Sequence, residues 1–122
     1  MSTTRIESIQ ATTTAAGHQA AVSFAMCQLL WEHPELPPAH WTISSDQASF
    51  GRQMNGHLQE EHATLETFQA YVQALGAEIE SAPPYAVCGG VVRAHVAKAL
   101  WRGVRVEVLV VLPAKVVVET TS

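Results

Sequence analysis

Apolar residues in the first part of the chain recur at helical spacing. Between residues 15 and 31, Val22, Met26 and Leu29 follow one another at intervals of three or four residues, which places them along one helical face. Three prolines between residues 34 and 38 end this pattern, because proline cannot continue a helix. The pattern predicts a first helix over residues 15–31.

After the prolines the apolar period changes from helical to alternating. Trp41 and Ile43 alternate with polar residues, as in a half-buried strand, and a second alternating run covers residues 50–54. The dipeptide Asn55-Gly56 is typical of a turn and is predicted to end this second strand. The segment therefore predicts a β-hairpin.

A second helical stripe follows the hairpin. Leu58, Leu65, Phe68 and Val72 lie at spacings that share one face, and they predict a helix over residues 59–75. Gly76 lies where a left-handed C-terminal cap is wanted, a conformation that glycine adopts without steric cost.

The most regular pattern lies between residues 91 and 112, where two β-rich runs flank Arg102-Gly103. A two-residue loop that ends in glycine predicts a tight hairpin turn, although arginine is uncommon where positive φ is required. A two-residue loop also predicts the cross-strand pairs. These are Trp101 with Val104, Ala99 with Val106, Lys98 with Glu107, and His95 with Val110.

This register sorts the hairpin residues onto two faces of the sheet. One face collects the residues that we expect the helices to cover: Ala97, Ala99, Trp101, Val104, Val106, Val108, Val110 and Leu112. The other face carries Lys98 and Glu107 but also an apolar group. That group is Val92, Val96, Leu109 and Val111. A sheet with one solvated face normally alternates more cleanly, so this group predicts an interface.

Together these elements predict one α+β domain of two layers. We expect an antiparallel sheet of four to five strands, covered on one face by two helices, in the order α-β-β-α-β-β-β. Residues 77–81 supply a short strand before the final hairpin. Residues 1–14 are predicted to be a flexible arm, residues 15–113 the domain, and residues 114–122 a tail or, through Val116–Val118, an edge strand.

Composition narrows the classes of partner. The 122 residues carry a net charge of −4 with seven Lys and Arg, which argues against a nucleic-acid partner. No apolar run is long enough for a membrane span or a signal peptide, so we expect a cytoplasmic protein without a membrane partner. Cys27 and Cys88 are expected to be reduced and mostly buried, although the sequence leaves a disulfide between them open.

The densest polar cluster lies at the start of the second predicted helix. His57 and Glu61, or His57 and Glu60, would share a helical face and are weak candidates for metal ligands. No third ligand is visible in the sequence, and acidic residues also stabilise a helix N-terminus without a metal. We predict no cofactor and no bound metal.

His95 is the other candidate for chemistry. The hairpin register points His95 and Arg93 toward the helices, where a pocket between the first helix and the sheet could also include His40. A buried imidazole bonded to the backbone is the simpler interpretation. No nucleophile motif is present, so no catalytic residue is assigned.

Parts of the chain resemble a known group of proteins. Leu30–Pro38, Trp41–Ser44, Ala74–Gly76 and the run from Arg102 to Pro113 are similar to segments of short uncharacterised actinobacterial proteins, often carried by phages, plasmids or integrative elements. The resemblance implies an accessory protein of a mobile element or its host, and it transfers no site residues. The apolar tail from Val116 departs from the group.

The pattern of faces leads to two hypotheses for function. The first is a non-enzymatic interaction module that forms a homodimer, or binds another protein, through the apolar sheet face or an edge strand. The second is a small-molecule-binding protein or minor enzyme with the pocket near His95.

Overall fold

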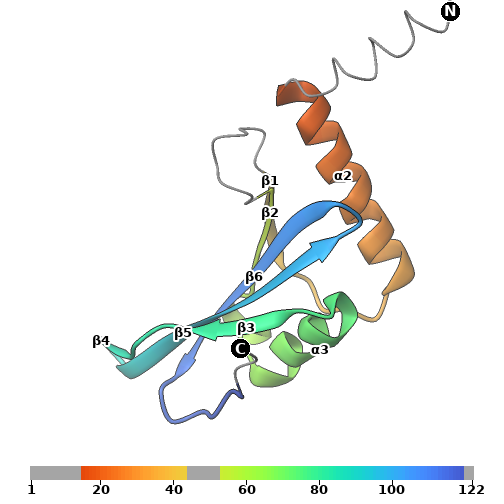
Figure 1. Ribbon diagram of the computed structural model, residues 1–122. Coiled ribbons are helices and arrows are strands. Elements are labelled where there is room, and N and C mark those ends of the chain that lie inside the picture. The colour runs from red at the N-terminus through yellow and green to blue at the C-terminus, as the bar shows by residue number, and fades with distance from the viewer. Residues whose placement is uncertain (1–14, 44–52, 120–122) are drawn as a thin grey trace, which may run out of the picture.

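Across the residues that the structure describes, the chain forms a six-stranded sheet with two α-helices on one side of it (Figure 1). The computed structural model describes residues 15–43 and 53–119, so the predicted arm over residues 1–14 lies outside the described residues. Its elements, in chain order, are α2 (Ala15–Glu32), β1 (His40–Ile43), β2 (Met54–His57), the 3₁₀ helix η2 (Glu60–His62), α3 (Leu65–Leu75), β3 (Glu78–Ser81), β4 (Tyr85–Val87), β5 (Gly90–Trp101) and β6 (Val104–Pro113).

The strand order corrects the predicted sheet. The order is β1-β2-β6-β5-β3, with β4 paired to β5, and the pairing of β2 with β6 is parallel while the others are antiparallel. The prediction of an antiparallel sheet of four to five strands was therefore only partly right, because the described sheet is mixed and has six strands. The chain passes through α3 and the other strands between β2 and β6, and such a long connection permits parallel pairing where a hairpin does not.

The long hairpin of β5 and β6 has the predicted register. Trp101 pairs with Val104 and His95 with Val110, with the other pairs in step. Arg102 and Gly103 have φ angles of 51° and 81°, the positive values that a type I′ turn requires. The two predicted faces of this hairpin are confirmed.

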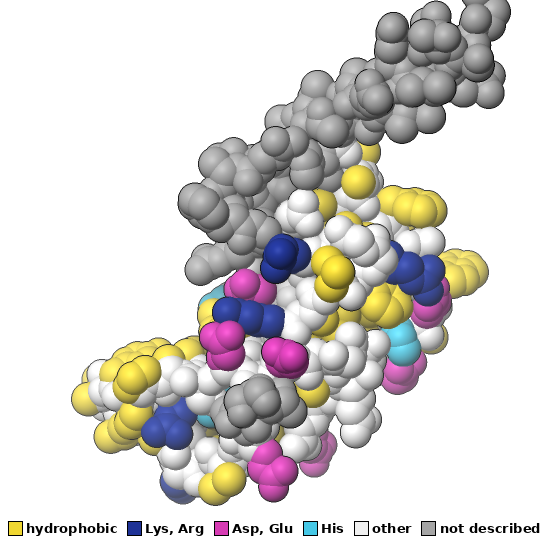
Figure 2. Space-filling model, viewed as in Figure 1, with side chains coloured by type: hydrophobic (Ala, Val, Ile, Leu, Met, Phe, Trp, Pro, Cys, Tyr) yellow, Lys and Arg dark blue, Asp and Glu magenta, His cyan; other side chains and the backbone are white. Residues whose placement is uncertain are grey.

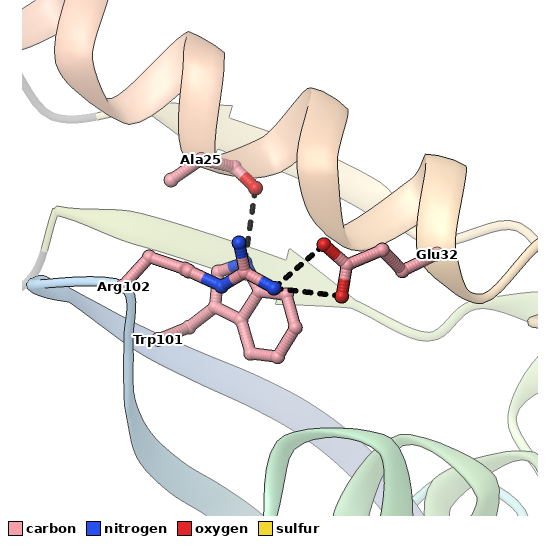
Figure 3. Close-up of polar contacts among 4 residues, drawn as sticks. All are labelled: Ala25, Glu32, Trp101 and Arg102. Carbon is pink, nitrogen blue, oxygen red and sulfur yellow. Dashed lines mark hydrogen bonds and ion pairs between the residues drawn. The ribbon is translucent and has the colours of Figure 1, made fainter.

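Tertiary contacts explain the uncommon arginine in this turn (Figure 3). The guanidinium of Arg102 donates to both carboxylate oxygens of Glu32, at 2.8 and 2.6 Å, and lies 4.9 Å from the centroid of the Trp101 ring. The indole Nε1 of Trp101 donates to the backbone oxygen of Ala25 at 3.1 Å. The turn is thus attached to the C-terminal half of α2, which helps to offset the cost of positive φ at Arg102.

The second strand of the first hairpin differs from its prediction. Asn55-Gly56 lies inside β2 and does not end a strand, whereas most of the predicted run over residues 50–54 lies outside the described residues. The Trp41 ring explains the glycine, because a Cβ atom on Gly56 would meet this ring at 2.8 Å. Glycine here serves close approach of a side chain to the strand, not a turn.

The second helix begins later than predicted. Residues 60–62 form the 3₁₀ helix η2, and α3 begins at Leu65 with Thr64 as its N-cap, whose side chain accepts a hydrogen bond from the backbone of Thr67. Gly76 has φ 64° and caps α3 in the left-handed conformation, as predicted.

The segment Val116–Val118, which was predicted as one possible edge strand, is not a strand. Val116 and Val118 are half-buried and pack against the core without strand pairing. In the part of the chain that the structure describes, the additional strand is instead β4, which the prolines at residues 83 and 84 concealed in the sequence.

The core lies between the sheet and the two helices. Trp101 binds α2 through Ala25, and Phe68 of α3 lies against the His95 ring, so both helices cover the same inner face. The largest fully buried side chains include Tyr71, Phe68, Leu29, Met54 and Leu58. The opposite face of the sheet, which we call the outer face, carries neither helix.

Candidate functional site

The outer face changes in character along its length. Its β5 and β6 residues pair, from one end to the other, as Val92 with Pro113, Ala94 with Val111, Val96 with Leu109, Lys98 with Glu107, and Leu100 with Arg105. The first three pairs are apolar and the fourth is charged. This order places the four predicted interface residues at one end of the face and the charges at the other.

Strand β4 extends the apolar part of this face. Tyr85 pairs with Val92 and therefore points to the same side of the sheet, where its side chain is 46% exposed. We name this surface the apolar end, and its residues are Tyr85, Val92, Ala94, Val96, Leu109, Val111 and Pro113. Figure 2 shows hydrophobic side chains gathered where β4 and the start of β5 lie in Figure 1.

Sequence reasoning missed Tyr85 although a signal was present. The residues from Ala82 to Val92 include no charged residue, and those from Ala82 to Val91 are exposed. A contiguous exposed apolar patch, unlike scattered apolar residues, calls for an explanation.

The other part of the outer face carries both signs of charge. Lys98 forms an ion pair with Glu80 of β3 at 3.1 Å, and Glu78, Arg105 and Glu107 lie nearby on the same face. This mixture lacks the single-signed field that would attract a highly charged partner. It is typical of a solvated rim.

A shallow hollow of about 350 Å³ opens on the outer face between the two parts. Val96 and Leu109 lie at its apolar side, and His40 and His57, which pair across β1 and β2, line its polar side. His40 and His57 also line a second hollow of about 240 Å³, toward η2.

The two weak candidates for metal ligands lie in different elements. His57 lies in β2 and Glu61 in η2, so they do not share a helical face as expected. The nitrogen Nδ1 of His57 lies 3.4 Å from the side-chain nitrogen of Gln59. Within residues 15–43 and 53–119, no three His, Cys, Asp or Glu side chains are grouped so that they could hold a metal ion.

His95 is buried under α3. Its side chain is 1% exposed, its ring centroid lies 6.3 Å from that of Phe68, and its Nδ1 lies 2.6 Å from Ser81 Oγ. The second ring nitrogen, Nε2, is buried without a hydrogen-bond partner, and so is Nε of Arg93. Burial lowers the pKa of His95, and the charge of Arg93 lowers that pKa further.

The structure does not bring the three predicted pocket residues together. Arg93 and His95 lie on the inner face, but His40 is exposed on the outer face beside His57. His95 also packs against α3, not between the first helix and the sheet. The reason is that side chains along a strand alternate between the two faces of the sheet. His40 pairs with His57, and His57 pairs with the outer-face residue Leu109, so His40 also lies on the outer face.

Acid is expected to destabilise the fold through His95. Because its pKa in the folded state lies below the ordinary value of 6.5, the unfolded chain takes up the proton first as the pH falls. The contribution of neutral His95 to the free energy of unfolding is therefore fully present above about pH 6.5. It declines as the pH falls from there toward the lowered pKa. Urea unfolding measured between pH 7.5 and pH 5 checks this.

A matched pair of variants tests whether His95 causes the loss of stability in acid. His95→Gln removes the buried imidazole and should flatten the decline between about pH 6.5 and 5, whereas His40→Gln, at an exposed position, should retain it. An unchanged pH dependence in His95→Gln would show that another group is responsible.

The two cysteines differ from their prediction in burial but not in pairing. Cys27 and Cys88 are free thiols and both are exposed. The disulfide left open by the sequence is absent, and the expectation of mostly buried cysteines was wrong, because Cys27 lies on the solvent side of α2 and Cys88 in the β4–β5 turn.

Comparison of the chain with protein-family models, with curated proteins and with solved structures found no match. Across the described residues, none of the helices has the length and apolar character needed to cross a bilayer.

Proposed function

We propose that this protein is a non-enzymatic interaction module that forms a homodimer through the apolar end of its outer face. The observation that carries the proposal is a sheet with both helices on one side and an apolar cluster on the other. Val92, Val96, Leu109 and Val111 are each half-buried within the single chain, so a partner would remove their remaining surface from water.

The apolar end by itself is a small interface. Its five paired rows of β5 and β6, with the three residues of β4, cover roughly 200 Å² in projection at about 3.3 Å per residue and 4.8 Å per strand. Standard interfaces bury about 800 Å² of accessible surface per partner, so this surface lies at the low end of the range, where association is weak.

A second copy fits this face better than a highly charged partner. A two-fold axis at the apolar end would stack the apolar ends of two copies and leave each charged part at the rim. The rim charges Lys98, Arg105, Glu78, Glu80 and Glu107 have both signs, so two copies would not repel one another strongly. The accessory role in a mobile element that the resemblance implies stays a prediction.

Val111→Lys is expected to weaken the dimer, because an ammonium group would be buried among apolar side chains without a partner. We expect a loss of about 1–3 kcal/mol for each copy, which is at least about a tenfold rise in Kd. Size-exclusion chromatography with light scattering, over a range of protein concentrations, measures the change.

Leu100→Lys is the matched control, since Leu100 lies on the same face but at the charged end, where it is 70% exposed. It should leave the dimer unchanged. Equal effects of the two variants, or a monomeric wild-type protein at all micromolar concentrations, would contradict the proposal.

A further inference from the structure

Helix α2 presents an apolar stripe to solvent. Phe24 is 66% exposed and Trp31 is 86% exposed, and Ala20 and Cys27 are exposed on the same side of the helix. These four residues, which we name the α2 seam, are spaced by four, three and four positions. This is the spacing of the apolar seam in a packed pair of helices.

The opposite side of α2 already fills the inner face of the sheet. Val22, Ala25 and Leu29 are buried there, so packing within the chain does not require the seam. From Ala15 to Trp31 the helix contains no Asp, Glu, Lys or Arg. A helix that is covered on one side normally carries charged residues on the other, and one that is apolar all round is normally buried.

We infer that the α2 seam packs antiparallel against the α2 seam of a second copy, about a two-fold axis between Phe24 and Cys27. In this register Phe24 lies opposite Cys27 of the second copy, and Ala20 lies opposite Trp31 of the second copy. Each large side chain therefore meets a small one, which is the complementarity that close packing of two helices requires.

The seam is large enough for association. Phe and Trp bury roughly 150–250 Å² each, so the two exposed aromatic side chains of each copy supply on the order of 600 Å² in a dimer. The remaining length of a helix of about 27 Å adds to this, against about 1,200 Å² for a small specific interface.

The absence of charge on the α2 seam also favours a second copy as the partner that covers it. An uncharged seam gains nothing from a charged partner, whereas two uncharged seams meet without desolvating an ion. This surface lies on the opposite side of the molecule from the apolar end, so the inference goes beyond the proposed function. A protein with two separate two-fold surfaces can form assemblies larger than a dimer.

Crosslinking through the native Cys27 tests the register. The axis places the two Cys27 thiols close together, so a short bismaleimide should join two copies in a protein whose other exposed thiol is removed by Cys88→Ser. The control moves the thiol around the helix with Cys27→Ala and Ala21→Cys, at another exposed position off the seam.

We expect the Cys27 protein to crosslink on the order of 100-fold faster than the control at micromolar concentration, because the dimer holds its thiols at an effective concentration near millimolar. Trp31→Glu should abolish this advantage, while Gln73→Glu, which adds the same charge at an exposed position of α3, should retain it. At a concentration low enough for the wild-type protein to be monomeric, thermal unfolding should be unchanged in both variants, since neither side chain is in the core.

Equal crosslinking rates in the Cys27 and Ala21→Cys proteins would overturn the inference, and so would an unchanged rate in Trp31→Glu. Val111→Lys separates this inference from the proposed function, because it alters only the outer face. If Val111→Lys weakens association while the Cys27 crosslink is absent, only the α2 pairing fails. If the crosslink survives and Val111→Lys has no effect, only the outer-face dimer fails.

Discussion

Phe68→Ala is expected to lower the free energy of unfolding by about 3–5 kcal/mol, the usual range when a large core aromatic is truncated. Phe68 is 0% exposed and lies between α3 and the inner face, where it covers the His95 ring. Its loss leaves a cavity beneath α3 that neighbouring side chains fill only in part. Urea unfolding at neutral pH measures the change.

Phe24→Ala is the matched control for this change, because it removes the same atoms from a residue that is 66% exposed. The unfolding free energy of the monomer should change by less than about 0.5 kcal/mol, while crosslinking through Cys27 should fall. A large loss of monomer stability in Phe24→Ala would mean that α2 packs differently from the arrangement described above.

Gly56→Ala is expected to destabilise the fold by about 1–3 kcal/mol, as other overpacked sites do. The added Cβ would lie 2.8 Å from the Trp41 ring, and that ring packs against Tyr71 in an edge-to-face arrangement, with ring centroids 6.0 Å apart. The indole therefore has little room to move without disturbing a buried neighbour. The measurement is the midpoint of thermal or urea unfolding.

Gly89→Ala provides the comparison, since nothing lies within 4 Å of the Cβ that it would add. It should be neutral or slightly stabilising, because alanine restricts the unfolded chain more than glycine does. If Gly56→Ala were as harmless as Gly89→Ala, the Trp41 ring would not be fixed against β2.

The local sequence pattern was sufficient to predict the structure where residues close in sequence decide it. The turn at Arg102-Gly103 sets the register of its two strands, and the period of two then assigns each side chain to a face. The first helix and the Gly76 cap follow from spacing and from the steric freedom of glycine. The outer-face group that the proposed function uses was visible for the same reason.

Predictions from the local sequence pattern failed where contacts with a distant segment decide the structure. Asn55-Gly56 has the sequence of a turn, but the Trp41 ring requires glycine at that place within a strand. The three predicted pocket residues were separated because His40 belongs to a strand whose register depends on β2 and β6.

The sequence by itself determined the periods, the tight turn and the two faces of the long hairpin, because these depend on residues within a few positions of one another. Only the tertiary structure decided that β6 lies parallel to β2, that α3 covers His95, and that Phe24 and Trp31 remain exposed. These outcomes depend on which surfaces meet when the whole chain packs, and residues far apart in sequence contribute to them jointly.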